Sequence, residues 1–217
     1  MSTVLALLLA DARLPAAGHT QSGGLEPGLA DGLDPHNLPA YVRSRLATVV
    51  RTEATTAVVA RHHALAGSSL DPVEAAWAAR TPSDAMRATA RTLGRGLLRL
   101  ARRTWPAAVA GWAPDATPPR AVVLGAVAAG AGLSAVELAR VVAYDDTQTV
   151  LSAALKLLPL DPADATAWCV ELLPDVDRLA HEVSTLTETT DIPATGSPQI
   201  EAWAQAHARA TRRLFSA

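Results

Sequence analysis

The sequence predicts an all-α protein, a single-domain bundle of about eight helices. Three observations support this prediction. Helix-start signals recur along the chain, apolar residues recur at three- and four-residue steps, and no segment of useful length alternates apolar and polar residues as a strand would. The chain has 217 residues, of which 49 % are hydrophobic and 18 % are charged, so it can bury one sizeable core.

The N-terminal part, residues 1–33, combines a leucine-rich segment with a glycine-rich loop. Residues 4–10 are apolar and predict a helix. No Lys or Arg precedes them and the run is short for a signal peptide, so we expect no secretion signal. Residues 18–32 contain five glycines and predict a shaped loop in front of a long helix.

Residues 34–190 predict the helical core, because helix starts there are marked by one repeated device. A residue that favours the N-cap precedes a proline, which has no N–H to leave unsatisfied in the first helical turn. Ser134 and Glu137 add a capping box. The pairs, including one that opens the last helix, are Asp34 with Pro35, Asp71 with Pro72, Thr81 with Pro82, Asp161 with Pro162, and Ser197 with Pro198.

Three further features complete the organisation of the chain. Residues 111–120 contain three prolines and predict a connector between helices. Pro174 predicts a kink or a split in the helix that follows Pro162. Residues 191–217 predict a C-terminal helix and a tail.

Composition excludes several classes of protein. The net charge of −2 is too balanced for attraction of the whole chain to nucleic acid or to an anionic membrane. The longest apolar run, residues 121–133, is shorter than the ~20 residues that a membrane span needs. Cys169 is the only cysteine, so an intramolecular disulfide and a thiol-rich metal site are both excluded, and we expect it to be a buried thiol. We therefore predict a cytoplasmic protein.

No motif of catalysis or of stable cofactor binding stands out. Gly125, Gly130 and Gly132 have the glycine spacing of a phosphate-binding loop but lack its Lys and Ser/Thr, so they predict close helix packing. Ser22 lies among glycines but does not match the Gly-x-Ser-x-Gly nucleophile motif. We predict no catalytic residue and no stably bound cofactor.

The residues that bind metals in other proteins are not spaced as ligands here. His62 and His63 are adjacent and point apart on a helix, and no histidine pair has the zinc-protease spacing. Asp145 and Asp146 predict a solvated turn of helix. We predict no metal site, and the sequence leaves a transient nickel contact open.

A stripe of arginines follows the helix predicted after Pro82. These residues step by three or four, and no acidic residue follows Asp84 within the helix. Two interpretations stay open: a solvated face paired with carboxylates of other helices, or a docking surface for an acidic partner. Nucleic acid is disfavoured, because no aromatic residues interleave with the arginines. The stripe consists of Arg87, Arg91, Arg95, Arg99 and Arg102, with Arg103 beside it.

Both ends of the chain carry a resemblance to a known family. Residues 7–15 read Leu-Leu-Leu-Ala-Asp-Ala-Arg-Leu-Pro, and residues 18–26 read Gly-His-Thr-Gln-Ser-Gly-Gly-Leu-Glu. With residues 93–100, Leu-Gly-Arg-Gly-Leu-Leu-Arg-Leu, and 212–216, Arg-Arg-Leu-Phe-Ser, this order resembles the urease accessory protein F family. One departure concerns Leu160, which is followed by Asp161 and Pro162 where the family commonly has Gly-Gln.

The resemblance implies a helical, non-catalytic scaffold for nickel insertion into urease. Members form homodimers and assemble with a D-type accessory protein, a G-type GTPase and apo-urease, so that nickel and GTP are handled by the partner complex. The expected partner-binding residues in the glycine-rich loop and in the tail are His19, Ser22, Gly23, Gly24, Glu26, Arg212, Arg213 and Phe215.

Each of these candidates also has a purely structural interpretation. For the loop it is a conformation that serves helix packing, and for the tail it is a frayed terminus.

Two other functions are compatible with the composition. One is a small helical enzyme with its active site at loop 18–26, which would require a concave pocket and an acid/base partner near His19. The other is a helical interaction protein unrelated to urease. An adaptor instead predicts a broad exposed surface at the loop.

Overall fold

The computed structural model describes residues 2–11, 14, 20–211 and 213–215, with Ser2 described by its backbone alone. These residues form helices and turns without a strand, so the predicted all-α class is confirmed. The helices are α1 (Ser2–Leu9), α2 (Leu25–Ala30), α3 (Leu38–Ala47), α4 (Val49–Leu65), α5 (Asp71–Arg80), α6 (Asp84–Thr104), α7 (Arg120–Ala131), α8 (Ala135–Leu157), α9 (Pro162–Val183) and α10 (Pro198–Arg209). Short 3₁₀ helices lie at η2 (Pro35–Asn37), η3 (Pro106–Val109) and η4 (Thr189–Asp191).

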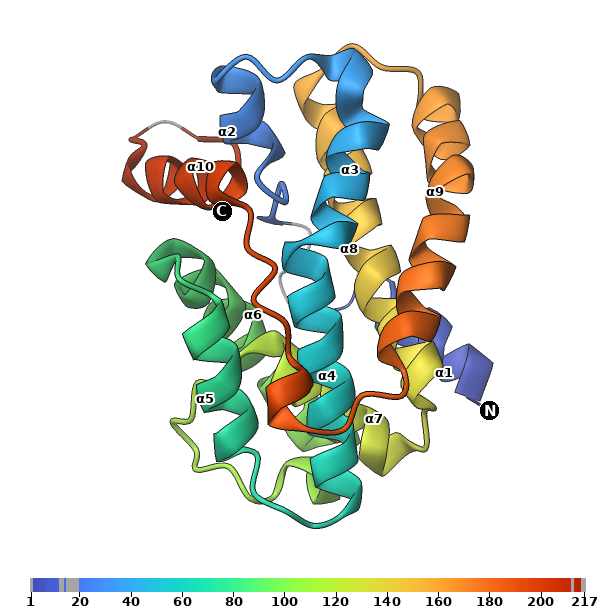
Figure 1. The fold of residues 1–217 in the computed structure, drawn as a ribbon, viewed down its shortest axis with the longest axis vertical. Coiled ribbons are helices and arrows are strands. Elements are labelled where there is room, and N and C mark those ends of the chain that lie inside the picture. Colours follow the sequence, from blue (N-terminus) through green and yellow to red (C-terminus); the bar gives the residue numbers. More distant parts are fainter. Residues whose placement is uncertain (1, 12–13, 15–19, 212, 216–217) are drawn as a thin grey trace.

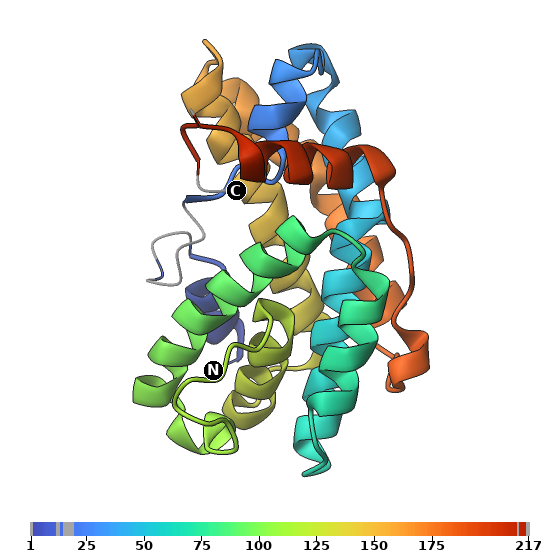
Figure 2. The ribbon, with the colours of Figure 1, turned by 90° about the vertical axis from the view of Figure 1, so that its left-hand side faces the viewer.

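Helix α4 is the centre of the bundle. It packs most extensively on α7 and also contacts α3, α5, α8 and α9, while α8 and α9 form a second closely packed pair (Figure 1). Helix α10 lies across one face of the bundle, beside α2 and next to the start of α6 (Figure 2). The segment that contains α2 therefore meets the last helix there, whereas α1 lies apart from them and packs on α8 (Figure 1). No helix within the described ranges has the length and apolarity that crossing a bilayer requires.

Most of the predicted helix starts are formed, and two are displaced by a few residues. Asp34 and Asp161 cap as expected, each accepting a hydrogen bond from the backbone N–H two residues later. Ser134 and Glu137 form the capping box. At the start of α6 the cap is Ser83, whose Oγ accepts the N–H of Met86 at 3.3 Å, instead of Thr81. Asp71 is the first residue of α5 and not its N-cap.

The long helix expected after Pro35 is divided into α3 and α4 at Thr48. This residue has φ −120° and ψ −100°, which no helix accommodates. Its carbonyl accepts the Thr195 hydroxyl at 3.0 Å, and the Thr52 hydroxyl donates to the Pro193 carbonyl at 3.1 Å. A segment about 145 residues away therefore satisfies the polar groups at the break. This division and the short α2 give more helices than the sequence predicted.

Pro174 does not split α9, which continues from Pro162 to Val183. The carbonyl that loses its partner to a proline belongs to the residue four positions earlier, here Val170. Val170 is 61 % exposed, so water can satisfy this carbonyl without interruption of the helix.

Two glycines allow helices to approach more closely than any side chain would permit. A Cβ at Gly125 on α7 would lie 2.5 Å from the Ala57 carbonyl oxygen on α4. A Cβ at Gly94 on α6 would lie 1.9 Å from the Pro118 carbonyl oxygen of the 111–120 connector. The prediction of close helix packing is confirmed for Gly125 and was wrong for Gly132, which ends α7 with φ +74° and has open space where a Cβ would lie. Helix α7 is consequently enclosed, with every residue from 121 to 128 buried.

Candidate functional site

The glycine-rich loop is held rigidly against the bundle. Gly23 and Gly24 have φ values of +60° and +79°, which residues with a side chain rarely adopt. The Gly23 carbonyl accepts hydrogen bonds from the Tyr41 hydroxyl at 2.7 Å and from Arg45 Nη1 at 2.6 Å. Ser22 is fully buried, and its Oγ accepts the N–H of Glu26 at 3.4 Å. In the single chain these groups serve the fold, and the Ser22 hydroxyl does not reach the surface.

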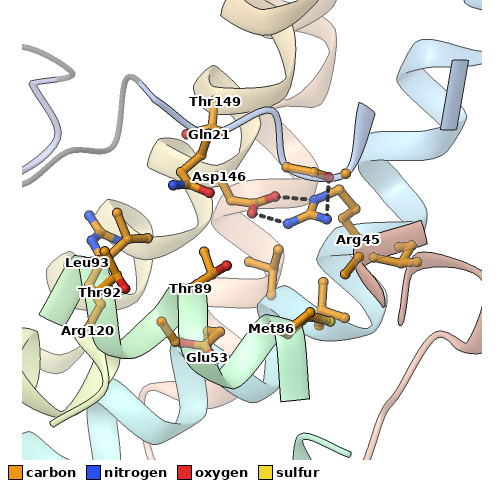
Figure 3. Close-up of a pocket in the computed structure, with 18 of the residues that line it drawn as sticks. Gln21, Arg45, Glu53, Met86, Thr89, Thr92, Leu93, Arg120, Asp146 and Thr149 are labelled. Atoms are coloured by element: carbon orange, nitrogen blue, oxygen red, sulfur yellow. Dashed lines mark hydrogen bonds and ion pairs between the residues drawn. The ribbon is translucent and has the colours of Figure 1, made fainter. Parts of the chain in front are cut away.

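A buried ion pair lies directly beneath the loop. Arg45 binds Asp146 with two hydrogen bonds, Nε to Oδ2 at 2.9 Å and Nη2 to Oδ1 at 2.5 Å (Figure 3). Burial lowers the pKa of Arg45, but Asp146 and Tyr41 outweigh burial and raise it above the ordinary value. The planar fork of a guanidinium suits such a bidentate contact. The same arginine thus fixes α8 through Asp146 and the loop through Gly23.

The expectation that Asp145 and Asp146 form a solvated turn was wrong. Both lie in the middle of α8, and Asp145 pairs with Arg120 of α7 at 3.1 Å. Burial raises the pKa of Asp145, and Arg120 opposes this shift. Two adjacent carboxylates on one helix are typical of a solvent-exposed position. The two arginines that allow them to be partly buried come from other helices, and only the tertiary fold brings them there.

A cleft of about 460 Å³ opens between the loop, α4, α6, α8 and α10. Its walls carry apolar side chains such as Met86 and Leu93, with Thr89 and Thr92 beside them (Figure 3). Glu53 lines the cleft and accepts the indole N–H of Trp77 at 2.6 Å, and burial raises the pKa of its carboxyl group. Among the described residues, no cluster of three or more His, Cys, Asp or Glu side chains could hold a metal ion.

The C-terminal tail binds back onto the glycine-rich loop through Glu26. The Glu26 carboxylate accepts the backbone N–H groups of Leu214 at 2.6 Å and Phe215 at 3.0 Å, and it lies 3.1 Å from His207 Nε2. Burial raises the pKa of Glu26, but the two backbone hydrogen bonds and His207 outweigh it, so the pKa is lowered. Phe215 is 4 % exposed in its own chain, and Lys156 Nζ lies 5.2 Å from the ring centroid.

The structure therefore joins two candidates that lie at opposite ends of the sequence. Loop 20–26, α10 and tail residues 213–215 form one continuous site, which we call the terminal site. Helix α10 is fixed to the end of α2, because the Trp203 indole N–H donates to Asp31 Oδ2 at 2.7 Å. Arg213 is exposed at the edge of the cleft. His19 and Arg212 lie outside the described residues.

The arginine stripe on α6 divides into two groups. Arg87, Arg91 and Arg102 hold neighbouring segments: Arg87 bonds the Thr81 carbonyl and Asp84, Arg91 bonds Glu74 and the Thr117 carbonyl, and Arg102 bonds the carbonyls of Ala113 and Pro114. The predicted pairing with a carboxylate of another helix is therefore seen at Arg91, whereas Arg87 pairs within its own helix and Arg102 binds backbone carbonyls.

The other three arginines of the helix are exposed. Arg95 bonds only the neutral hydroxyl of Thr92, at 3.3 Å. Arg99 and Arg103 contact no polar partner among the residues that the structure describes.

The one cysteine is a structural residue. Cys169 is buried, its Sγ accepts Gln148 Nε2 at 3.0 Å, and burial raises the pKa of the thiol. The prediction of a buried thiol is confirmed.

Comparison with known proteins gives one consistent result. The UreF family model matches residues 33–173, about two thirds of the chain. The Urease accessory protein UreF of Mycolicibacterium vanbaalenii is 37 % identical over 220 residues, covering 100 % of both chains. The protein of the same name from Mycobacterium sp. strain JLS is likewise 37 % identical over 220 residues and all of both chains. That of Mycobacterium tuberculosis H37Rv is 35 % identical over 217 residues, covering 99 % of this chain and 98 % of the relative.

Proposed function

The chain belongs to the UreF family of urease accessory proteins, and on this premise we propose that it is a non-catalytic adaptor in the insertion of nickel into urease. It bridges a D-type accessory protein and a G-type GTPase to apo-urease and modulates the GTP-dependent assembly of the metal centre. Nickel and GTP are handled by the partner complex. The adaptor acts in the cytoplasm as a homodimer.

The terminal site is the observation that supports this proposal most. The full-length relatives align with both ends of this chain, although the family match itself covers only residues 33–173. Glu26, in the first turn of α2, bonds to the tail, and the tail exposes Leu214 at 63 % beside the buried Phe215. An exposed apolar residue next to a fixed backbone segment is suited to a protein partner. We propose that the D-type accessory protein binds at this site.

The alternative of a helical enzyme is weaker, although the cleft supplies the concave pocket that it requires. Asp145 and Asp146 are occupied by Arg120 and Arg45, and one oxygen of Glu53 is occupied by Trp77. Covalent catalysis needs a nucleophile bonded to a base. Of the described hydroxyls that line the cleft, none is bonded to a carboxylate or to an imidazole. Membership of the UreF family also argues against the other alternative, a helical interaction protein unrelated to urease.

The decisive experiment compares a host carrying a complete set of urease genes with and without this gene. Nickel supply and apo-urease level are matched, and urease activity and bound nickel are measured. The proposal expects loss of activity, accumulation of nickel-free apo-urease, and recovery when the gene is returned. Active, nickel-loaded urease in the absence of the gene would overturn the maturation role in that host. Copurification with the D-type protein and the GTPase, and size-exclusion chromatography with light scattering, test the partners and the dimer.

A further inference from the structure

Three exposed arginines form a line along the C-terminal half of α6, and we call Arg95, Arg99 and Arg103 the arginine ridge. Successive members are four residues apart, so they lie about 6 Å apart along the helix axis and the ridge is about 12 Å long. Resting on the proposed function, we propose that this ridge docks an acidic surface of a protein partner in the urease-maturation assembly.

The ridge differs from the ion-paired surface of α3, α8 and α9 because its charge is not neutralised. On α3, α8 and α9, Arg43 pairs with Glu171 and Asp175, Arg140 pairs with Asp177, and Arg178 pairs with Asp175. The ridge arginines have no carboxylate within ion-pair distance among the described residues. A general preference of this chain for arginine explains the residue type, and it does not explain the absence of acidic neighbours.

The like charges of the ridge also work against the helix that carries them. Cations four residues apart on one helix face repel and slightly destabilise it. Carboxylates of a partner at a similar spacing, as on one face of an acidic helix, would remove this repulsion and match the ridge one to one. Charge complementarity of this kind mainly increases the association rate and selects the partner.

The position of the ridge separates it from the terminal site. Helix α10 contacts α6 near its start, where Gln205 Nε2 donates to Ser83 Oγ at 3.2 Å. The ridge residues lie 12 to 20 positions after Ser83, which corresponds to a distance of about 18 to 30 Å along the helix axis. A second partner on the ridge would therefore lie away from this contact between α10 and α6. Thr92, seven residues before Arg99 and hence on the same helix face, lines the cleft, so the second partner would lie beside its mouth.

The ridge favours a protein over nucleic acid or lipid. Bases stack on aromatic side chains, and α6 has none. The chain as a whole has a net charge of −2, which does not draw it to a polyanion. Three cations along about 12 Å are enough to pair with a small acidic patch on a protein surface.

The test is the triple charge reversal Arg95→Glu, Arg99→Glu, Arg103→Glu in the full chain, with the triple Arg→Lys variant as the control that keeps the charge. Binding of each protein to the purified D-type accessory protein, the G-type GTPase and apo-urease is measured by biolayer interferometry at 50 and 300 mM salt. Because the ridge makes one side-chain hydrogen bond to the part of the chain that the structure describes, circular dichroism should give melting temperatures close to wild type for both variants.

The proposal expects the Glu variant to lose at least about 10-fold in affinity for one of the three proteins, and the Lys variant to stay within about 3-fold of wild type. The wild-type affinity for that protein should fall with salt. Equal binding by wild type and the Glu variant to every protein that the wild type binds would overturn the ridge proposal alone. Absence of wild-type binding to all three would overturn the proposed function as well.

Two further probes distinguish other occupants of the ridge. Binding to vesicles of phosphatidylserine and phosphatidylcholine, and to a 20-base-pair DNA duplex, is measured with the same variants. Ridge-dependent binding to either probe, without ridge-dependent binding to a protein, would replace the acidic protein by lipid or nucleic acid and overturn the proposal.

Discussion

Replacing Glu26 by Gln should release the C-terminal tail without unfolding the bundle. The carboxylate accepts two backbone N–H groups, at 2.6 Å from Leu214 and 3.0 Å from Phe215. A glutamine keeps one acceptor oxygen, and its amide nitrogen is a donor that cannot accept the second N–H. Hydrogen bonds to a charged group contribute about 1.5–3 kcal/mol each, and neutral ones about 1 kcal/mol. Loss of one charged bond and weakening of the other together lower the free energy of tail docking by about 2–5 kcal/mol.

The assay is amide hydrogen exchange of Leu214 and Phe215, followed by NMR. Since 1.4 kcal/mol corresponds to a factor of ten, protection at these two amides should fall by roughly 30- to 4,000-fold. Opening of the tail is a local event, so protection in α4 and α7 should change little. Glu171→Gln is the matched control, because Glu171 pairs with Arg43 on a remote exposed surface. Unchanged protection at Leu214 and Phe215 in the Glu26→Gln protein would refute the assigned role of Glu26.

The same interaction has a defined pH dependence. The pKa of Glu26 is lowered from its ordinary value of 4.5 in the folded protein. A lowered carboxyl pKa contributes stability that is fully present above the unfolded value and is lost as the pH falls through the folded value. Tail protection in the wild type should therefore decrease in acid below pH 4.5, whereas the Glu26→Gln variant should show little change.

Four other substitutions, of which Gly111→Ala is a control, test the packing and the buried charges by urea unfolding. Gly94→Ala should lower the free energy of unfolding by about 3 kcal/mol or more, because the new Cβ would lie 1.9 Å from a backbone oxygen. The control Gly111→Ala has open space around it and should change this free energy by less than ~1 kcal/mol. Equal effects of the two substitutions would contradict the packing argument. Asp146→Ala leaves the Arg45 guanidinium buried without its carboxylate and should lower the free energy of unfolding by about 3–5 kcal/mol. A loss under ~1 kcal/mol would show that the ion pair does not stabilise the fold. Glu53→Gln should stabilise the protein at pH 7, because burial raises the pKa of this carboxyl group and so disfavours its charged form. The gain in stability should shrink as the pH falls toward 4.5. A stability difference between the two proteins that does not depend on pH would contradict burial of the charge as its cause.

Local sequence signals predicted the helices well where the determining contacts are local. A side-chain cap and the N–H that it bonds are two or three residues apart, so Asp34, Asp161 and the Ser134 capping box can be recognised from sequence. The break at Thr48 could not be predicted, because the groups that satisfy it come from residues 193–195. The periodicity of apolar residues continues through the break and gives no sign of it.

The candidate site was predicted in its parts and not in its arrangement. The loop and the tail were both identified by resemblance, but no local pattern indicates that Glu26 bonds to residues 188 and 189 positions later in the chain. The Arg45 pair with Asp146 was missed for the same reason, since its partners are 101 positions apart. The arginine stripe was recognised as a whole, and only the fold separates its structural members from its exposed ones.

The enclosure of α7 has a consequence for handling the protein. After Arg120 the helix carries no charged side chain, and residues 121–128 are covered on every side by neighbours that include α4 and α6. Any partly opened state in which α4 or α6 detaches would expose an uninterrupted apolar surface to other copies. Aggregation during heating or refolding should therefore begin at α7. A charged residue introduced within it would prevent correct folding as well as association, so solubility is better improved on the surface of the helices that cover it.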